Sequence, residues 1–139
     1  MSSAINGNMW YLSRGFSSQG PNKHAFSVCL DELIFQAVSQ SDDVTSPSTP
    51  SPWQTLPDTP LEHSTVLVLN GALLAVGGWK SSAIHVYQPS NSSWVNIGEL
   101  PTERSLCACL VLPSGKIFVA GGSGPRNVIT NCVHIATIE

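Results

Sequence analysis

Apolar residues occur along this chain in short stretches that are rich in aliphatic and β-branched side chains and are separated by Gly, Pro, Ser and Asn. Such spacing is typical of short strands joined by tight turns. Four strands are predicted in the middle of the chain, at residues 64–69, 72–76, 83–87 and 94–97. Asn70-Gly71 separates the first two strands, and both residues tolerate positive φ, which favours a two-residue hairpin. This segment therefore predicts one antiparallel sheet of four strands.

The same pattern of strands recurs on both sides of this segment. Three strands are predicted after it, at residues 106–112, 116–120 and 132–136, and three before it, at residues 8–12, 25–30 and 53–56. Residues 39–52 are rich in Ser, Thr, Pro and Asp, a composition that cannot bury a core and predicts an exposed, flexible loop. Weak helical spacing at residues 31–38 is interpreted as a strand end followed by a loop.

Two segments of the chain repeat each other. The segment 53–64 aligns with 94–105 at a constant shift of 41 residues, so that Trp, Pro, Glu and Ser recur in the same order. Downstream, Gly77-Gly78 corresponds to Gly121-Gly122, now 44 residues apart. A period in the low forties indicates repeated supersecondary units rather than one irregular domain.

These motifs resemble those of the kelch repeat family. The family pattern is an apolar strand that ends in Gly-Gly, followed by a Tyr and, about seven residues later, a Trp. Gly77-Gly78, Tyr87 and Trp94 match it, Gly121-Gly122 begins a second copy, and Trp53 closes a third. His134 lies near the position of the Tyr in the second copy.

The resemblance implies an all-β fold, a partial kelch β-propeller built of four-stranded antiparallel blades. It divides the chain into a partial blade at 1–57, a complete blade at 58–98 and a partial blade at 99–139 that lacks its last strand. Because propellers need about four to eight blades to close, we expect the chain to be a fragment of a longer propeller or a partial gene product. Its uncovered blade faces predict marginal stability and self-association.

The resemblance also implies structural roles for the motif residues. The glycines Gly77, Gly78, Gly121 and Gly122 would allow close backbone packing. Tyr87 and Trp94 would pack between neighbouring blades, and Trp53 would do so in the poorer copy. Glu62 and Glu103 would bind a backbone group or an arginine of a neighbouring blade; Arg104 is the expected partner of Glu103, and His63 stands at that place in the first copy.

Composition and charge exclude several classes of function. The formal net charge is −3, and the six Lys and Arg are scattered, so nothing predicts binding to nucleic acid or to an anionic membrane. No apolar run could span a bilayer and no signal peptide is recognised, so a cytoplasmic protein is expected. Cys107 and Cys109 would point to one face of a strand, where they are predicted to fill the interior rather than to bind metal. No pair among the four histidines has metal-ligand spacing, and no cofactor is predicted.

The sequence therefore predicts a non-enzymatic protein-binding module whose partner is unknown. In such modules, loops at one face form the contact surface on a rigid scaffold. The candidate contacts are Trp79 and Lys80 in the loop 79–82, and Arg126 in the loop 123–127, because both loops follow a Gly-Gly. The family includes ubiquitin-ligase substrate adaptors and actin binders, and this sequence selects neither. The alternatives are a fragment of a propeller enzyme, of the oxidase or sugar-acid isomerase type, and a degenerate remnant without independent function.

Overall fold

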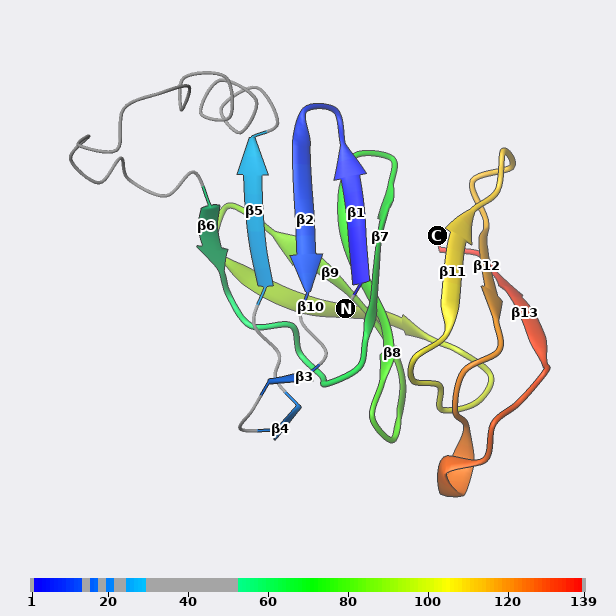
Figure 1. The fold of residues 1–139 in the computed structure, drawn as a ribbon. Helices are drawn as coiled ribbons and strands as arrows, with labels where there is room; N and C mark the ends of the chain where they lie inside the picture. Colours follow the sequence, from blue (N-terminus) through cyan, green and yellow to red (C-terminus); the bar gives the residue numbers. More distant parts are fainter. Residues whose placement is uncertain (1, 14–15, 18–19, 22–24, 30–52, 139) are drawn as a thin grey trace, which may run out of the picture.

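The computed structural model describes residues 2–13, 16–17, 20–21, 25–29 and 53–138, which form an all-β fold of antiparallel sheets (Figure 1). No α-helix occurs in these residues; one short 3-10 turn, η1, spans Pro125–Asn127. The predicted loop 39–52 and the segment 31–38 lie outside the described residues.

The second sheet is the complete four-stranded unit that the sequence predicted. It contains β7 (Thr65–Leu69), β8 (Ala72–Gly78), β9 (Ser81–Gln88) and β10 (Ser93–Glu99), and all neighbouring strands are antiparallel. Asn70 and Gly71 both have positive φ, of 50° and 80°, and join β7 to β8 as a two-residue turn. The predicted hairpin is therefore confirmed, with the backbone conformation for which Asn-Gly is suited.

The third sheet contains β11 (Ala108–Val111), β12 (Ile117–Ala120) and β13 (Val133–Ala136). β11 is shorter than the predicted strand 106–112 because Leu106 has a φ of +53°, which breaks the extended backbone before Cys107. Leu110, Val133 and Ile135 are each at least half exposed on the outer side of this sheet. Self-association through such a face stays a prediction.

The first sheet contains one strand more than the sequence predicted. Its order is β1 (Ser2–Asn6), β2 (Met9–Ser13), β5 (Ala25–Cys29) and β6 (Trp53–Leu56), so the expectation of three strands in this unit was wrong. Three of the five residues of β1 are Ser or Asn, which hid its strand character. The dipeptide Asn6-Gly7 repeats the hairpin signal of Asn70-Gly71, although here the two turn residues are Gly7 and Asn8. Two further short strands, β3 (Phe16–Ser17) and β4 (Gly20–Pro21), lie in the chain segment that connects β2 to β5 and pair with each other as a separate sheet.

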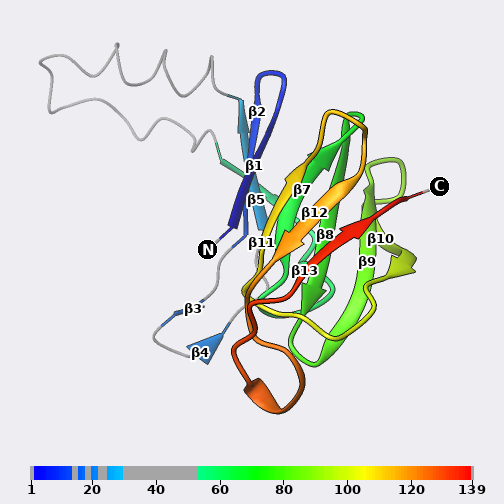
Figure 2. The same ribbon diagram turned by 90° about the vertical axis from the view of Figure 1, so that its right-hand side faces the viewer.

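The three sheets meet through their first strands (Figures 1 and 2). β7 packs against β1 on one side and against β11 on the other, whereas β6 and β10 are the last strands of their sheets. The Asn6 side-chain amide donates a 2.8 Å hydrogen bond to the carbonyl of Gly71, which ties the end of β1 to the turn of the second sheet. The described sheets form an open array and not a closed ring.

The main core lies between the second and third sheets. Its buried members come from both sheets and from the segment that links them: Leu67, Leu69, Leu74, Val76, Ile84, Leu100, Cys107, Ile117 and Val119. Alternate residues of each strand point into this space, as expected for strands with one buried face. In the part of the chain that the structure describes, no helix has the length and hydropathy that a membrane crossing requires.

Candidate functional site

Gly77 and Gly78 form a close junction between β8 and the segment that leads to the third sheet. Gly77 has a φ of +64°, and a Cβ atom added there would overlap the carbonyl oxygen of Arg104. Gly78 has a φ of +142°, and its N–H donates a 2.8 Å hydrogen bond to the same oxygen. A Cβ at Gly78 would lie only 2.5 Å from Cβ of Leu61. Only glycine combines these backbone angles with such an approach, so the role predicted for this doublet has a direct geometric basis.

The second doublet, Gly121-Gly122, makes a related junction within the third sheet. Gly122 has a φ of +87°, and a Cβ there would overlap the carbonyl oxygen of Ser105. Ser105 and Ser123 exchange two backbone hydrogen bonds of 2.9 and 2.8 Å beside it. Gly121 has a φ of +62° but more room, since the nearest atom to an added Cβ is the carbonyl oxygen of Thr130 at 3.7 Å. Gly122 is therefore the tighter position of this doublet.

The expected ion pair between Glu103 and Arg104 does not form. Arg104 is only 2% exposed, and its guanidinium binds the Gly121 carbonyl at 3.3 Å, the Thr102 hydroxyl at 3.2 Å and Nε2 of His134 at 2.7 Å. Among the described residues no carboxylate pairs with it. Adjacent residues of an extended segment point in opposite directions, which takes Glu103 away from the site of Arg104. The buried arginine instead joins the linking segment to β12 and β13.

Tyr87 and Trp94 lie directly opposite each other on β9 and β10. Their ring centroids are 5.3 Å apart with an interplanar angle of 49°, a favourable tilted arrangement of aromatic rings. The indole N–H of Trp94 donates a 3.4 Å hydrogen bond to the carbonyl of Pro57, in the segment that follows the first sheet. Trp94 thus links the last strand of the second sheet to the segment that leads out of the first sheet. Trp53 occupies the corresponding last strand of the first sheet, opposite Val28.

The turn that carries Trp79 and Lys80 is shorter than predicted. β8 ends at Gly78 and β9 begins at Ser81, so only two residues form the turn, where a loop 79–82 was expected. The Trp79 N–H donates a 2.8 Å hydrogen bond to the Glu62 carbonyl, and its side chain is 41% exposed. The Lys80 ammonium lies 6.0 Å from the centroid of the Trp79 ring, at the outer limit of a cation–π contact. A short turn with a fixed backbone presents both side chains on a rigid support.

Arg126 lies in the long connection between β12 and β13, within η1. It is exposed and has a φ of 59°, and Asn127 beside it has a φ of 60°. The Gly124 N–H donates to the Val128 carbonyl at 2.9 Å, and the Asn127 N–H donates to the Gly124 carbonyl at 3.1 Å. These two bonds fold the connection into a compact turn.

The connections that follow the second strand of each sheet lie at the same end of the molecule, which we call the loop end. Figures 1 and 2 show the β8–β9 turn, η1 and the pair β3 and β4 together at the bottom of both views. Trp79, Lys80 and Arg126 are therefore on one end, as the sequence predicted from their positions after Gly-Gly. The β11–β12 hairpin, with the exposed Lys116, lies at the opposite end.

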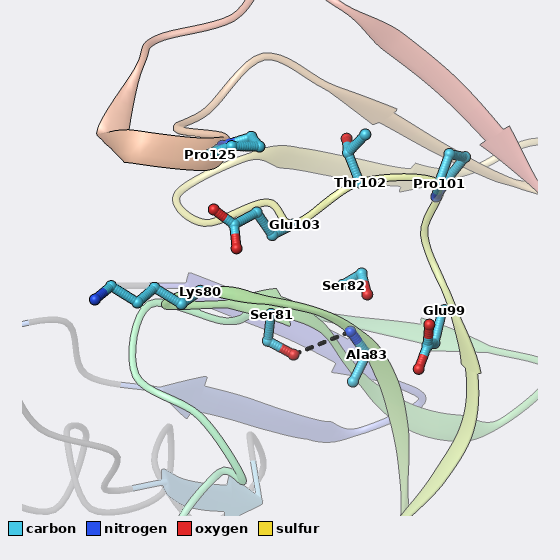
Figure 3. Close-up of a pocket in the computed structure, with 9 residues that line it drawn as sticks. All are labelled: Lys80, Ser81, Ser82, Ala83, Glu99, Pro101, Thr102, Glu103 and Pro125. Atoms are coloured by element: carbon cyan, nitrogen blue, oxygen red, sulfur yellow. Dashed lines mark hydrogen bonds between the residues drawn. The ribbon is translucent and has the colours of Figure 1, made fainter.

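An open cavity of about 480 Å³ lies at the loop end between the second and third sheets (Figure 3). It is lined by Lys80, Ser81, Ser82, Ala83, Glu99, Pro101, Thr102, Glu103 and Pro125. Figure 3 shows Glu103 across the cavity from Ser81, and the Lys80 side chain extends along its outer edge. The cavity places two carboxylates, a cation and several hydroxyl groups on one accessible surface.

Part of this lining falls in the two candidate loops predicted from the sequence, which also singled out Glu103, but no cavity between them was predicted. Glu99 is the last residue of β10, whereas Thr102 and Glu103 belong to the segment that links β10 to the third sheet and carries no strand pattern. One sequence signal could have pointed to this segment. Pro60 and Glu62 recur as Pro101 and Glu103, just before the first strands of the second and third sheets, which indicates that the connections leading into these two sheets have the same length. Among the described residues, no group of three or more His, Cys, Asp or Glu side chains is placed to hold a metal ion.

No protein-family model and no curated protein matches the sequence. The fold is similar to that of a solved structure of YjhT, with a TM-score of 0.69 and 16% sequence identity. The match covers 99% of this chain and 42% of the YjhT chain, so this chain spans less than half the length of that structure. At this identity the likeness concerns the fold alone.

Proposed function

We propose that the three sheets are consecutive blades of a kelch-type β-propeller and that its loop end binds a protein partner. The observation that carries this proposal is that Trp79, Lys80 and Arg126 gather at one end, each on a connection that follows a glycine doublet. Loops held on a rigid scaffold are the usual place for a binding surface.

The arrangement of the strands supports the propeller part of the proposal. The first strands β1, β7 and β11 lie side by side where the three sheets meet. In the first two sheets the following strands are then added in chain order, each farther from this contact than the one before. Blades of a propeller surround a central channel with this radial order. Nearly the whole chain is similar to less than half of the longer YjhT structure. This coverage agrees with a propeller that contains more blades than these three.

The chemistry of the loop end supports the binding part. Trp79 is a large aromatic side chain that is 41% exposed, although its backbone is hydrogen-bonded to Glu62. Tryptophan and arginine are enriched among residues that dominate binding energy, and a fixed backbone lowers the entropy lost on association. The adjoining cavity offers Glu99 and Glu103 for polar contacts around this anchor. The partner thus needs an apolar side chain to cover the indole of Trp79. It also needs polar groups around that side chain to bind the carboxylates of Glu99 and Glu103.

Replacing Trp79 by alanine is expected to weaken partner binding by about 2 kcal/mol, or roughly 30-fold in Kd, because an aromatic contact anchor is lost. The partner is first isolated by affinity capture with the chain, and its binding to purified variants is then measured by biolayer interferometry. Lys116→Ala is the matched control, since it removes an exposed cation at the opposite end. Equal Kd values for Trp79→Ala and the parent would contradict a role of the loop end in binding.

A further inference from the structure

Cys107 and Cys109 place their sulfur atoms 3.7 Å apart at the junction of the second and third sheets. Cys107 is 7% exposed and belongs to the main core, and Cys109 is half-buried and packs against it. The two side chains share one side of the chain, as alternation along an extended segment requires. Both thiols are free, so the junction holds a reduced pair in direct contact.

The surroundings of this pair make the two sulfur atoms unequal. A hydrogen bond from Cys109 lowers the pKa of the Cys107 thiol to about 6, although burial opposes the shift; the Thr65 hydroxyl and, more weakly, the charge of Arg104 act in the same direction as Cys109. The same hydrogen bond, with burial, raises the pKa of Cys109. The shared hydrogen bond therefore favours Cys107 as the thiolate of the pair and Cys109 as the thiol that donates to it, and a thiolate is the nucleophilic form of cysteine.

We propose that Cys107 and Cys109 form a peroxide-sensitive dithiol that closes reversibly to an intramolecular disulfide. The Cys107 thiolate attacks one oxygen of hydrogen peroxide and the O–O bond breaks, which leaves a Cys107 sulfenic acid and hydroxide. The Cys109 sulfur then attacks Sγ of Cys107, its proton and the departing hydroxide form water, and the S–S bond is made. The two sulfur atoms together lose two electrons, and the peroxide is reduced to one molecule of water and one hydroxide ion, which takes a proton from the solvent.

The backbone geometry indicates that the disulfide is labile. Residues two apart in an extended chain have Cα atoms about 6.6 Å apart, close to the upper limit of about 6.8 Å for a disulfide. A strained disulfide has a higher reduction potential and is readily opened by a dithiol reductant. The Thr65 hydroxyl of β7 donates a 2.7 Å hydrogen bond to the carbonyl of Cys107, the residue before β11, so a backbone shift of Cys107 on disulfide formation would disturb this contact.

The test uses the full chain and needs no variant for its first step. Trypsin cleaves after Arg104 and Lys116, which places Cys107 and Cys109 alone in one peptide, while Cys29 and Cys132 fall in two others. The chain is titrated with hydrogen peroxide, remaining thiols are blocked with N-ethylmaleimide, and the peptides are weighed. We expect the peptide 105–116 to lose two hydrogen atoms, about 2 Da, at doses that leave the exposed Cys132 free for blocking. Dithiothreitol before blocking should restore the dithiol.

Two variants test the order of the steps. In Cys109→Ser the hydroxyl at residue 109 can still donate a hydrogen bond to Cys107 but cannot form a disulfide, so the Cys107 sulfenic acid should be trapped by dimedone. In Cys107→Ala the remaining Cys109 should react no faster than Cys132. The proposal is overturned if the parent peptide takes up two N-ethylmaleimide groups at every dose below that which oxidises Cys132, or if the two sulfurs are oxidised separately. It is also overturned if Cys107 in Cys109→Ser is not trapped.

Discussion

Replacing Gly77 by alanine is expected to lower the free energy of unfolding by about 3 kcal/mol. A left-handed backbone costs a non-glycine residue about 1 kcal/mol or more, and overpacking in a tight site typically adds 1–3 kcal/mol. Gly77 has a φ of +64°, and the added Cβ would overlap the carbonyl oxygen of Arg104, which belongs to the backbone and cannot rotate away. Urea denaturation followed by tryptophan fluorescence measures the effect.

Gly98→Ala is the matched control for this substitution. Gly98 lies in β10, has no positive φ, and has no atom within 4 Å of an added Cβ. We expect its effect to stay within about 0.5 kcal/mol, as for surface substitutions that disturb no special contact. Similar free energies of unfolding for Gly77→Ala and Gly98→Ala would show that the doublet is not a close junction.

Replacing Arg104 by alanine is expected to cost about 3 kcal/mol of folding free energy. The substitution removes three hydrogen bonds of a guanidinium that is 2% exposed and leaves the Gly121 carbonyl without this donor. It also opens a cavity in the linking segment, and both effects destabilise. Chemical denaturation of the variant and of the exposed-cation control Lys116→Ala provides the comparison.

Arg104→Met separates packing from charge at the same position. No carboxylate among the described residues pairs with Arg104, and its buried Nε has no hydrogen bond to them, so the cation is incompletely compensated. An apolar side chain of similar volume can replace a buried charge with little loss, or even with a gain, when no opposite charge is left behind. We expect Arg104→Met to be more stable than Arg104→Ala by at least about 1 kcal/mol. Equal losses in the two variants would mean that the hydrogen bonds, and not the volume, determine the stability of this link.

The strands and hairpins could be predicted where local chemistry decides the structure. Asn70-Gly71 fixed one turn because both residues accept positive φ, and alternating apolar residues gave the strands of the second sheet. β1 was missed because three of its five residues are Ser or Asn, and its place depends on pairing with β2 and on the contact of Asn6 with Gly71. Long-range pairing of this kind leaves little trace in composition.

The candidate site was also predicted only where local sequence signals decide the structure. The repeat placed Trp79, Lys80 and Arg126 after the glycine doublets, and the common direction of the strands brings them to one end. The predicted length of the β8–β9 connection, four residues, was wrong. Gly78 pairs with Ser81, so the two strands extend to these residues and only two residues form the turn. The partner of Arg104 was also wrong: His134 is 30 residues away, and only the packing of β13 on the linking segment brings it within 2.7 Å.

Amide hydrogen exchange tests most directly the central claim that glycine junctions fasten the linking segments to the sheets and make the loop end rigid. The Gly78, Arg104 and Ser105 N–H groups each donate a backbone hydrogen bond of 2.8–2.9 Å across these junctions. We expect their protection to equal that of Leu74 in the centre of the second sheet, because the junctions should open only when the core opens. If these three amides exchange as fast as that of Ser92, in the exposed turn between β9 and β10, the loop end is not rigid and the account is contradicted.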